Sequence, residues 1–209
     1  FHGVIDLLKM KAYHYLAETL GAEYVEEEIP AHLVEKAEDA HKHLVEVASE
    51  LDDDLLEKYL EEEEISIDEL KAALRKGTCE VKIVPVLCGT AFKNKGVQPL
   101  LDAVIDYLPS AVDLPPVQGT SIDGEREIER KASDQEPFCG LIFKVMNDPY
   151  VGQLSFIRVY SGSIDQGKDV LNVNKNKTAK VGRLLRMHAN KREELTSIHS
   201  GDIGAVVGL

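Results

Sequence analysis

The 209-residue sequence lacks long hydrophobic runs and contains only three cysteines. Its apolar stretches, such as residues 81–88, are far shorter than the roughly 18 to 20 residues that a bilayer-spanning helix needs. No basic start followed by an apolar stretch is visible, so we expect no secretory signal and no membrane association. Cys79, Cys88 and Cys139 include no C-x-x-C spacing, which argues against a disulfide framework or a zinc site. The expected location is a reducing cytoplasm.

Complete nucleotide-binding motifs are missing as well. Residues 162–169 match G-x-x-x-x-G-K, but Asp169 stands where a phosphate loop needs Ser or Thr to hold magnesium. Strand-like residues flank this stretch on both sides, which favours a turn between two strands. No Asp is followed by Gly three residues later, so the D-x-x-G element is absent. The Asn-Lys pairs at 94–95 and 174–175 both lack the Asp of N-K-x-D.

The histidines predict neither a catalytic group nor a metal site. His41 and His43 lie two residues apart, so on a helix they point in different directions, whereas zinc favours histidines four apart on one face. A solvated helix face is the better interpretation. The chain starts with Phe1-His-Gly and ends with Val-Gly-Leu209, and we expect it to be an internal piece of a longer protein.

Charge is distributed unevenly. Residues 1–110 hold 24 acids and 11 bases, a net charge of −13, whereas residues 137–209 hold 6 acids and 10 bases, a net charge of +4. This asymmetry predicts two modules that face different partners. A solvated helical surface is the plainer interpretation of the acids, and a docking face for a basic protein is the functional one.

The acidic half has the pattern of a mixed α/β module. We expect strands at 2–8 and 22–29, the latter a charged edge strand, and helices at 30–49 and 52–60. Ser66 and Glu69 form a capping box that starts a helix expected to end at Gly77. Residues 81–88 are nearly all apolar, which predicts a strand buried on both faces of a parallel sheet. A loop at 89–96 and an amphipathic helix at 97–108 complete one α/β unit.

The second half is predicted to be β-rich. Residues 110–136 contain Pro115 and Pro116 and then a charged stretch, which predicts a linker that becomes a hairpin. Segments 138–147, 153–161, 168–174, 178–187 and 203–207 are rich in β-formers, and most are separated by Gly or Asn. We therefore expect a small β-barrel. The predicted modules are 1–109, 110–136 and 137–209.

Several specific motifs resemble one family. Residues 88–97 read Cys-Gly-Thr-Ala-Phe-Lys-Asn-Lys-Gly-Val, and residues 184–190 read Leu-Leu-Arg-Met-His-Ala-Asn. Together with 148–152, 158–162 and 201–209, they resemble bacterial-type elongation factor G across nearly the whole chain. Thr90 replaces the usual Ser of the guanine loop. The stop-codon release GTPase and the tetracycline-protection proteins share the barrel and stay open as alternatives.

The resemblance implies an α/β GTPase remnant with an inserted acidic α+β subdomain, followed by the translation-factor barrel. In that family the whole protein uses GTP and Mg²⁺ to drive tRNA and mRNA through the ribosome. The guanine loop here would be Thr90, Ala91 and Phe92, with the Ala91 N–H donating to guanine O6. The stalk-protein face would include Glu38, Asp39, Glu46 and Glu50. Contacts to ribosomal RNA would come from Lys180, Arg183, Arg186, His188 and Lys191.

This segment by itself is expected to be an inactive monomer without a bound cofactor, because one base-contacting loop cannot hold a nucleotide. A non-enzymatic acidic adaptor fused to a barrel is the competing interpretation. The two differ at residues 88–97. In a GTPase remnant, the amides of this loop should converge at the C-terminal edge of a parallel sheet, whereas in an adaptor the loop is an ordinary surface turn.

Overall fold

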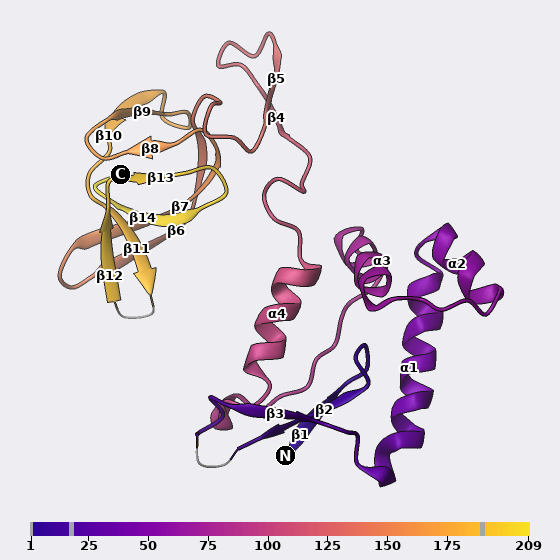
Figure 1. Cartoon of the computed structure of the whole chain (residues 1–209). Coiled ribbons are helices and arrows are strands. Elements are labelled where there is room, and N and C mark those ends of the chain that lie inside the picture. Colours follow the sequence, from indigo (N-terminus) through magenta and orange to yellow (C-terminus); the bar gives the residue numbers. More distant parts are fainter. Residues whose placement is uncertain (1, 17–18, 189–190) are drawn as a thin grey trace. The chain divides into compact units, whose positions relative to one another are not determined.

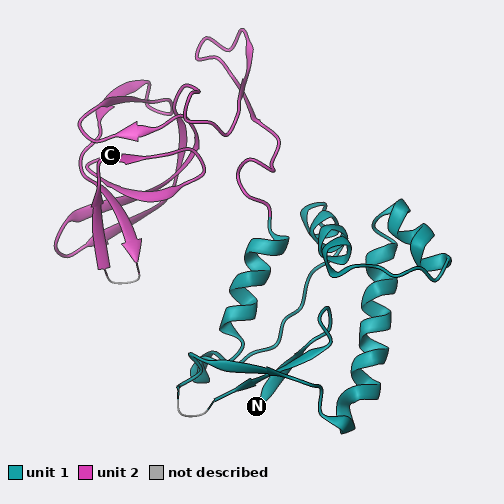
Figure 2. Cartoon of the chain, in the orientation of Figure 1, with its two compact units in different colours: residues 1–108 teal, residues 109–209 magenta. Residues whose placement is uncertain are grey.

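A computed structural model describes every residue except 1, 17–18 and 189–190. The chain forms two compact units, residues 1–108 and residues 109–209, drawn in different colours in Figure 2. Each unit has its own sheet and core and is described by itself. No helix in the described part of the chain is both long and apolar enough to cross a membrane.

Unit 1 begins with a three-stranded antiparallel sheet in the order β1-β2-β3. The strands are β1 (Gly3–Asp6), β2 (Lys11–Tyr15) and β3 (Tyr24–Glu27). The Asp6 carboxylate accepts the Leu8 and Lys9 N–H groups in the turn and, at 2.9 Å, the Tyr13 hydroxyl. The predicted edge strand at 22–29 is confirmed by β3, whereas β2 was not predicted from the sequence.

Three helices follow the sheet (Figure 1). After a short 3-10 turn, η1 (Ala31–Leu33), come α1 (Val34–Ser49), α2 (Asp53–Leu60) and α3 (Ile67–Cys79). They pack around a small core of Ala48, Leu55, Leu70 and Ala73. The capping box is confirmed: Ser66 Oγ accepts the Glu69 N–H, and the Glu69 carboxylate accepts the Ser66 N–H.

The expected end of α3 at Gly77 is wrong. The helix continues to Cys79, and Gly77 is buried inside it. A Cβ at Gly77 would lie 2.6 Å from Leu51 Cδ1 and 3.1 Å from Ile83 Cγ1. Glycine is therefore present because neighbouring side chains approach the backbone closely, and not because the helix needs a left-handed terminus.

The predicted buried strand at 81–88 is also wrong. These residues form no strand, and Val81 and Val86 are 83% and 87% exposed. A parallel strand needs hydrogen-bonded neighbours, and the only sheet in the described part of unit 1 is the antiparallel one. The next helix is as predicted, with α4 spanning Val97–Tyr107. It docks on α3 through the Lys71–Asp106 ion pair of 2.7 Å.

Unit 2 is almost entirely β-structure. Its first hairpin, β4 (Val117–Thr120) with β5 (Glu127–Arg130), confirms the predicted one. The main sheet has the order β12-β11-β14-β7-β6 and is accompanied by the pairs β9–β10 and β8–β13. The strands are β6 (Cys139–Asp148), β7 (Gly152–Ser161), β8 (Ile164–Asp165), β9 (Asp169–Asn172), β10 (Lys177–Lys180), β11 (Leu184–His188), β12 (Lys191–Leu195), β13 (Ser197–Ile198) and β14 (Ile203–Val207).

A small apolar cluster in unit 2 consists of Leu154, Leu185 and Ala205. The strands also surround a larger apolar core. Its most deeply buried members include Val159, Leu184, Ile198 and Val206. The predicted strand 178–187 is in fact two strands, β10 and β11, and the charged strand β12 was not predicted from the sequence. Residues 162–169 contain β8 and a turn, so the turn interpretation is confirmed. The predicted fold class, a mixed α/β region followed by a β-rich domain, is confirmed.

Candidate functional site

The guanine loop, residues 88–97, is closed by a small antiparallel bridge. The Thr90 N–H donates to Lys95 O at 2.8 Å, and the Lys95 N–H donates back to Thr90 O at 3.2 Å. The 3-10 turn η2 (Ala91–Lys93) forms the tip of the loop. Gly96 ends the loop with φ of +85°, and a Cβ there would lie 2.8 Å from Cys88 O. The backbone geometry therefore requires glycine at this position.

Two backbone donors remain at the tip of the loop. Within the described residues, no acceptor is assigned to the N–H groups of Ala91 and Phe92, while those of Lys93 and Asn94 are used inside the loop. Ala91 and Phe92 are exposed. An exposed N–H of this kind can donate to a carbonyl oxygen such as guanine O6, whereas adenine presents an amino group at that place.

Two side chains anchor the loop and the start of α4 to backbone carbonyls at the end of β2 and just before β3. The Lys95 ammonium donates to Tyr15 O at 3.5 Å, and the Gln98 amide donates to Gly21 O and Ala22 O, each at 3.1 Å. The expected convergence of its amides at the edge of a parallel sheet is not found, because no such sheet exists among the described residues. Several loop amides are paired internally. The loop geometry alone therefore does not separate a GTPase remnant from an adaptor.

The acidic face consists of Glu38, Asp39, Glu46 and Glu50. All four side chains are exposed, on α1 or at its C-terminal cap. Asp39, Glu46 and Glu50 are spaced by seven and four residues, which places them on one side of the helix. The described residues supply one ion-pairing partner for this set, His43 Nδ1 at 3.5 Å from Glu46. The face is thus a solvent-facing row of carboxylates.

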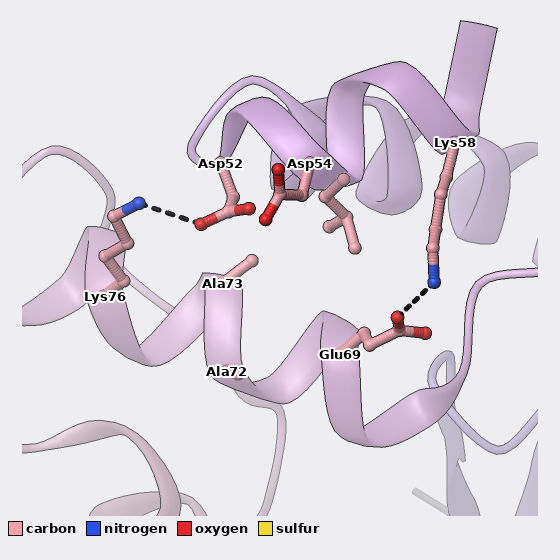
Figure 3. A pocket seen from close by; sticks show the side chains of 8 residues that line it. Asp52, Asp54, Lys58, Glu69, Ala72, Ala73 and Lys76 are labelled. Atoms are coloured by element: carbon pink, nitrogen blue, oxygen red, sulfur yellow. Dashed lines mark hydrogen bonds and ion pairs between the residues drawn. The ribbon is translucent and has the colours of Figure 1, made fainter.

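A groove of about 300 Å³ lies between α2 and α3 (Figure 3). Lys76 Nζ and the Asp52 carboxylate are 2.8 Å apart at one end, and Lys58 and Glu69 form an ion pair at the other. The pKa of Glu69 is lowered to about 2. The hydrogen bond from Lys58 has the largest effect, and the bonds from the Ser66 backbone and side chain come next. The groove is therefore bordered by paired charges, which join α2 to α3 in the module that carries the acidic face.

The basic hairpin consists of β11 and β12, and residues 189–190 between them lie outside the described residues. Arg186 stands opposite Glu193 in the register. Arg183 lies 3.5 Å from Glu194, and Arg186 and His188 lie 3.6 and 3.5 Å from Glu193. Three of the predicted RNA-contacting side chains therefore face carboxylates across the strand pair.

The other predicted cations are placed differently. Lys180 lies on β10, which pairs with β9 in a separate ladder, while Lys191 starts β12. Both are exposed, and among the described residues neither forms an ion pair. Sequence reasoning missed the effect of Glu193 and Glu194, because β12 was not recognised as a strand. The available signal is the pair Glu193-Glu194 shortly after the bases of β11, since a hairpin there brings Glu193 opposite Arg186.

Comparisons with known proteins match both units. Residues 19–110 match the family model for the elongation factor Tu GTP-binding domain, and residues 137–209 match that for elongation factor G domain 2. A crystal structure of a protein from Thermus thermophilus is similar, with 25% identity and a TM-score of 0.73 over 98% of this chain. This chain spans 27% of the length of that protein. With a GTP-binding-domain match followed by a domain-2 match, the chain belongs to the translational GTPase family.

Proposed function

We propose that the chain is a segment of a ribosomal translocase of the elongation factor G type. The parent protein would hydrolyse GTP with Mg²⁺ in the cytoplasm to move tRNA and mRNA through the ribosome. This segment would contribute one guanine-contacting loop, a docking face for the stalk protein and contacts to ribosomal RNA. The observation that carries the proposal is the GTP-binding-domain match followed by the domain-2 match. The loop Gly-Thr-Ala-Phe-Lys-Asn-Lys-Gly is consistent with it, because the Ala91 N–H is exposed and has no acceptor among the described residues.

The apolar surface beside this loop supports the same assignment. Val84 and Val86 are exposed, and α4 exposes Leu101 and Ile105. A strand and a helix taken from the middle of a larger α/β domain would have such faces, because neighbouring strands cover them in the complete domain.

The segment alone should neither bind nor hydrolyse GTP measurably. Phosphate and magnesium contacts supply much of the affinity of such sites, and the sequence has no complete phosphate loop, D-x-x-G or N-K-x-D. Isothermal titration with GDP and Mg²⁺ tests this directly. Binding at micromolar GDP would refute it, whereas no heat beyond dilution is the expected result.

The acidic face is proposed to dock the C-terminal domain of the ribosomal stalk protein. Exposed carboxylates in a row favour association with a basic partner. An NMR titration of the segment with that domain should shift the amides of α1. Glu50→Gln should weaken binding, and Glu64→Gln, an equal change of an exposed acid outside the face, should not. Unchanged spectra at millimolar partner would count against this docking site.

The barrel is proposed to bind RNA weakly through Lys180 and Lys191, with a smaller contribution from the paired Arg183, Arg186 and His188. Phosphate contacts release counterions, so affinity should fall as salt rises. Lys191→Gln should weaken binding more than Arg186→Gln, because Glu193 already offsets the charge of Arg186. Affinity that is independent of salt, or equal losses in the two variants, would exclude this assignment of contacts.

A further inference from the structure

A small pocket in unit 2 is lined by two arginines that the proposed function does not use. Arg130 from the end of β5 and Arg158 from β7 line it together with Tyr160, Pro115 and Pro116. Its volume is about 60 Å³. One water needs roughly 10–15 Å³ of cavity volume. The space therefore suits a single oxyanion and is too small for a nucleotide.

Strand alternation places Arg158 in this pocket. On β7, Ile157 and Val159 are buried in the core, so Arg158 and Tyr160 point to the opposite face of the sheet. The Arg158 guanidinium lies 5.1 Å from the centroid of the Tyr160 ring, which fixes its orientation. The Nε atom of Arg158 is buried, and no hydrogen-bond acceptor for it is found among the described residues. A buried donor of this kind is costly unless it finds an acceptor.

Neither arginine has a carboxylate partner within the part of the chain that the structure describes. In the described parts of the chain, no Asp or Glu forms an ion pair with Arg130 or Arg158, although the sequence holds 37 acids and 24 bases. Arg130 Nη1 donates to Glu129 O at 3.1 Å, which leaves its other N–H groups available. Arg130 and Arg158 both line this pocket, and the other lining residues apart from Tyr160 are apolar. Guanidinium groups offer planar, paired donors of the kind that bind phosphate.

We propose that this pocket binds a single phosphate group, held by Arg130 and Arg158. The phosphate could belong to an RNA backbone or be a free ion, and the recognition chemistry is the same for both. The pocket is formed by β5, β7 and residues 111–117 and does not include the basic hairpin. The inference therefore stands or falls independently of the proposed ribosomal role.

The test is an NMR titration of the chain with inorganic phosphate at constant ionic strength, observing the arginine Nε–Hε signals. The expected result is a saturable shift of the Arg158 and Arg130 signals. Arg130→Gln and Arg158→Lys should each weaken binding at least about tenfold, because paired charge-assisted hydrogen bonds are lost. Arg126→Gln is the matched control, since Arg126 belongs to the same hairpin but does not line the pocket.

A second arm uses a short single-stranded RNA in place of phosphate. RNA binding that is weakened by the same two variants identifies an RNA phosphate as the ligand, and phosphate binding without RNA binding identifies a free ion. A linear, non-saturating response to phosphate would overturn the proposal. So would an equal loss in Arg126→Gln, which would indicate general charge attraction. Circular dichroism of each variant checks that unit 2 remains folded.

Discussion

The two units differ in whether their longest apolar segments find strand partners, although both also expose apolar side chains. Unit 2 encloses Val159, Leu184 and Val206 completely within its own strands. Unit 1 has a core of small helix contacts and leaves Val84 and Val86 exposed beside α4. The difference shows which unit completes its own sheet: unit 2 pairs its long strands, whereas the apolar run at 81–88 finds no strand to pair with among the described residues.

The largest expected effect comes from truncating the two kinds of apolar residue. Leu184→Ala in the closed core should cost about 2–5 kcal/mol of the free energy of unfolding of unit 2, because a cavity remains. Val84→Ala, at a side chain that is 79% exposed, should change the stability of unit 1 by less than about 0.5 kcal/mol. Urea unfolding followed by circular dichroism measures both. Similar losses in the two variants would contradict the comparison.

A smaller effect is expected where unit 1 packs tightly. Gly77→Ala adds a Cβ 2.6 Å from Leu51 Cδ1 and 3.1 Å from Ile83 Cγ1 inside α3. It should therefore fail to give unit 1 the roughly 1 kcal/mol that alanine gains over glycine at an open helix position. Gly119→Ala, where a Cβ meets no atom within 4 Å, is the control. If Gly77→Ala instead stabilised the helix, as alanine does in an open helix position, α3 would not pack here as described.

The capping box should have a more modest effect. Ser66→Ala removes the side chain that accepts the Glu69 N–H, and loss of such a cap costs about 1 kcal/mol. Ser121→Ala, on an exposed turn of unit 2, is the control. It shows how much stability is lost when a hydroxyl that accepts a backbone N–H is removed outside a helix. Thermal unfolding of both variants should show the loss in unit 1 only for Ser66→Ala. No change there would mean that α3 starts without this cap.

The smallest effect is the part of the pH dependence of unit 1 that comes from Glu69. The pKa of Glu69 falls from 4.5 to about 2 through the bond from Lys58 and those from Ser66. A lowered folded-state pKa contributes stability above the unfolded value, and that contribution is lost as pH falls from about 4.5 towards 2. Glu69→Gln should flatten the acid unfolding of unit 1 in this window. An unchanged profile would mean that the ion pair is absent in solution.

The sequence predicted those features that depend on local signals. The capping box at Ser66, helices α1, α2 and α4, and the turn at 162–169 all follow from residue spacing and are confirmed. Features that depend on distant partners were not predictable. Residues 81–88 read as a strand because the apolar run is present, but a strand also needs a neighbour. The charge balance of the basic hairpin depends on Glu193, which the strand register places opposite Arg186, and on Glu194, which lies 3.5 Å from Arg183.

Amide hydrogen exchange in the guanine loop tests the central claim most directly, namely that this loop keeps a free donor for guanine. The N–H groups of Thr90 and Lys95 are hydrogen-bonded across the loop, and that of Ala91 has no partner among the described residues. Thr90 and Lys95 should therefore exchange slowly and Ala91 at nearly the rate of an unstructured peptide. Ala91 exchange as slow as that of Thr90 would contradict the account, because the donor would already be occupied.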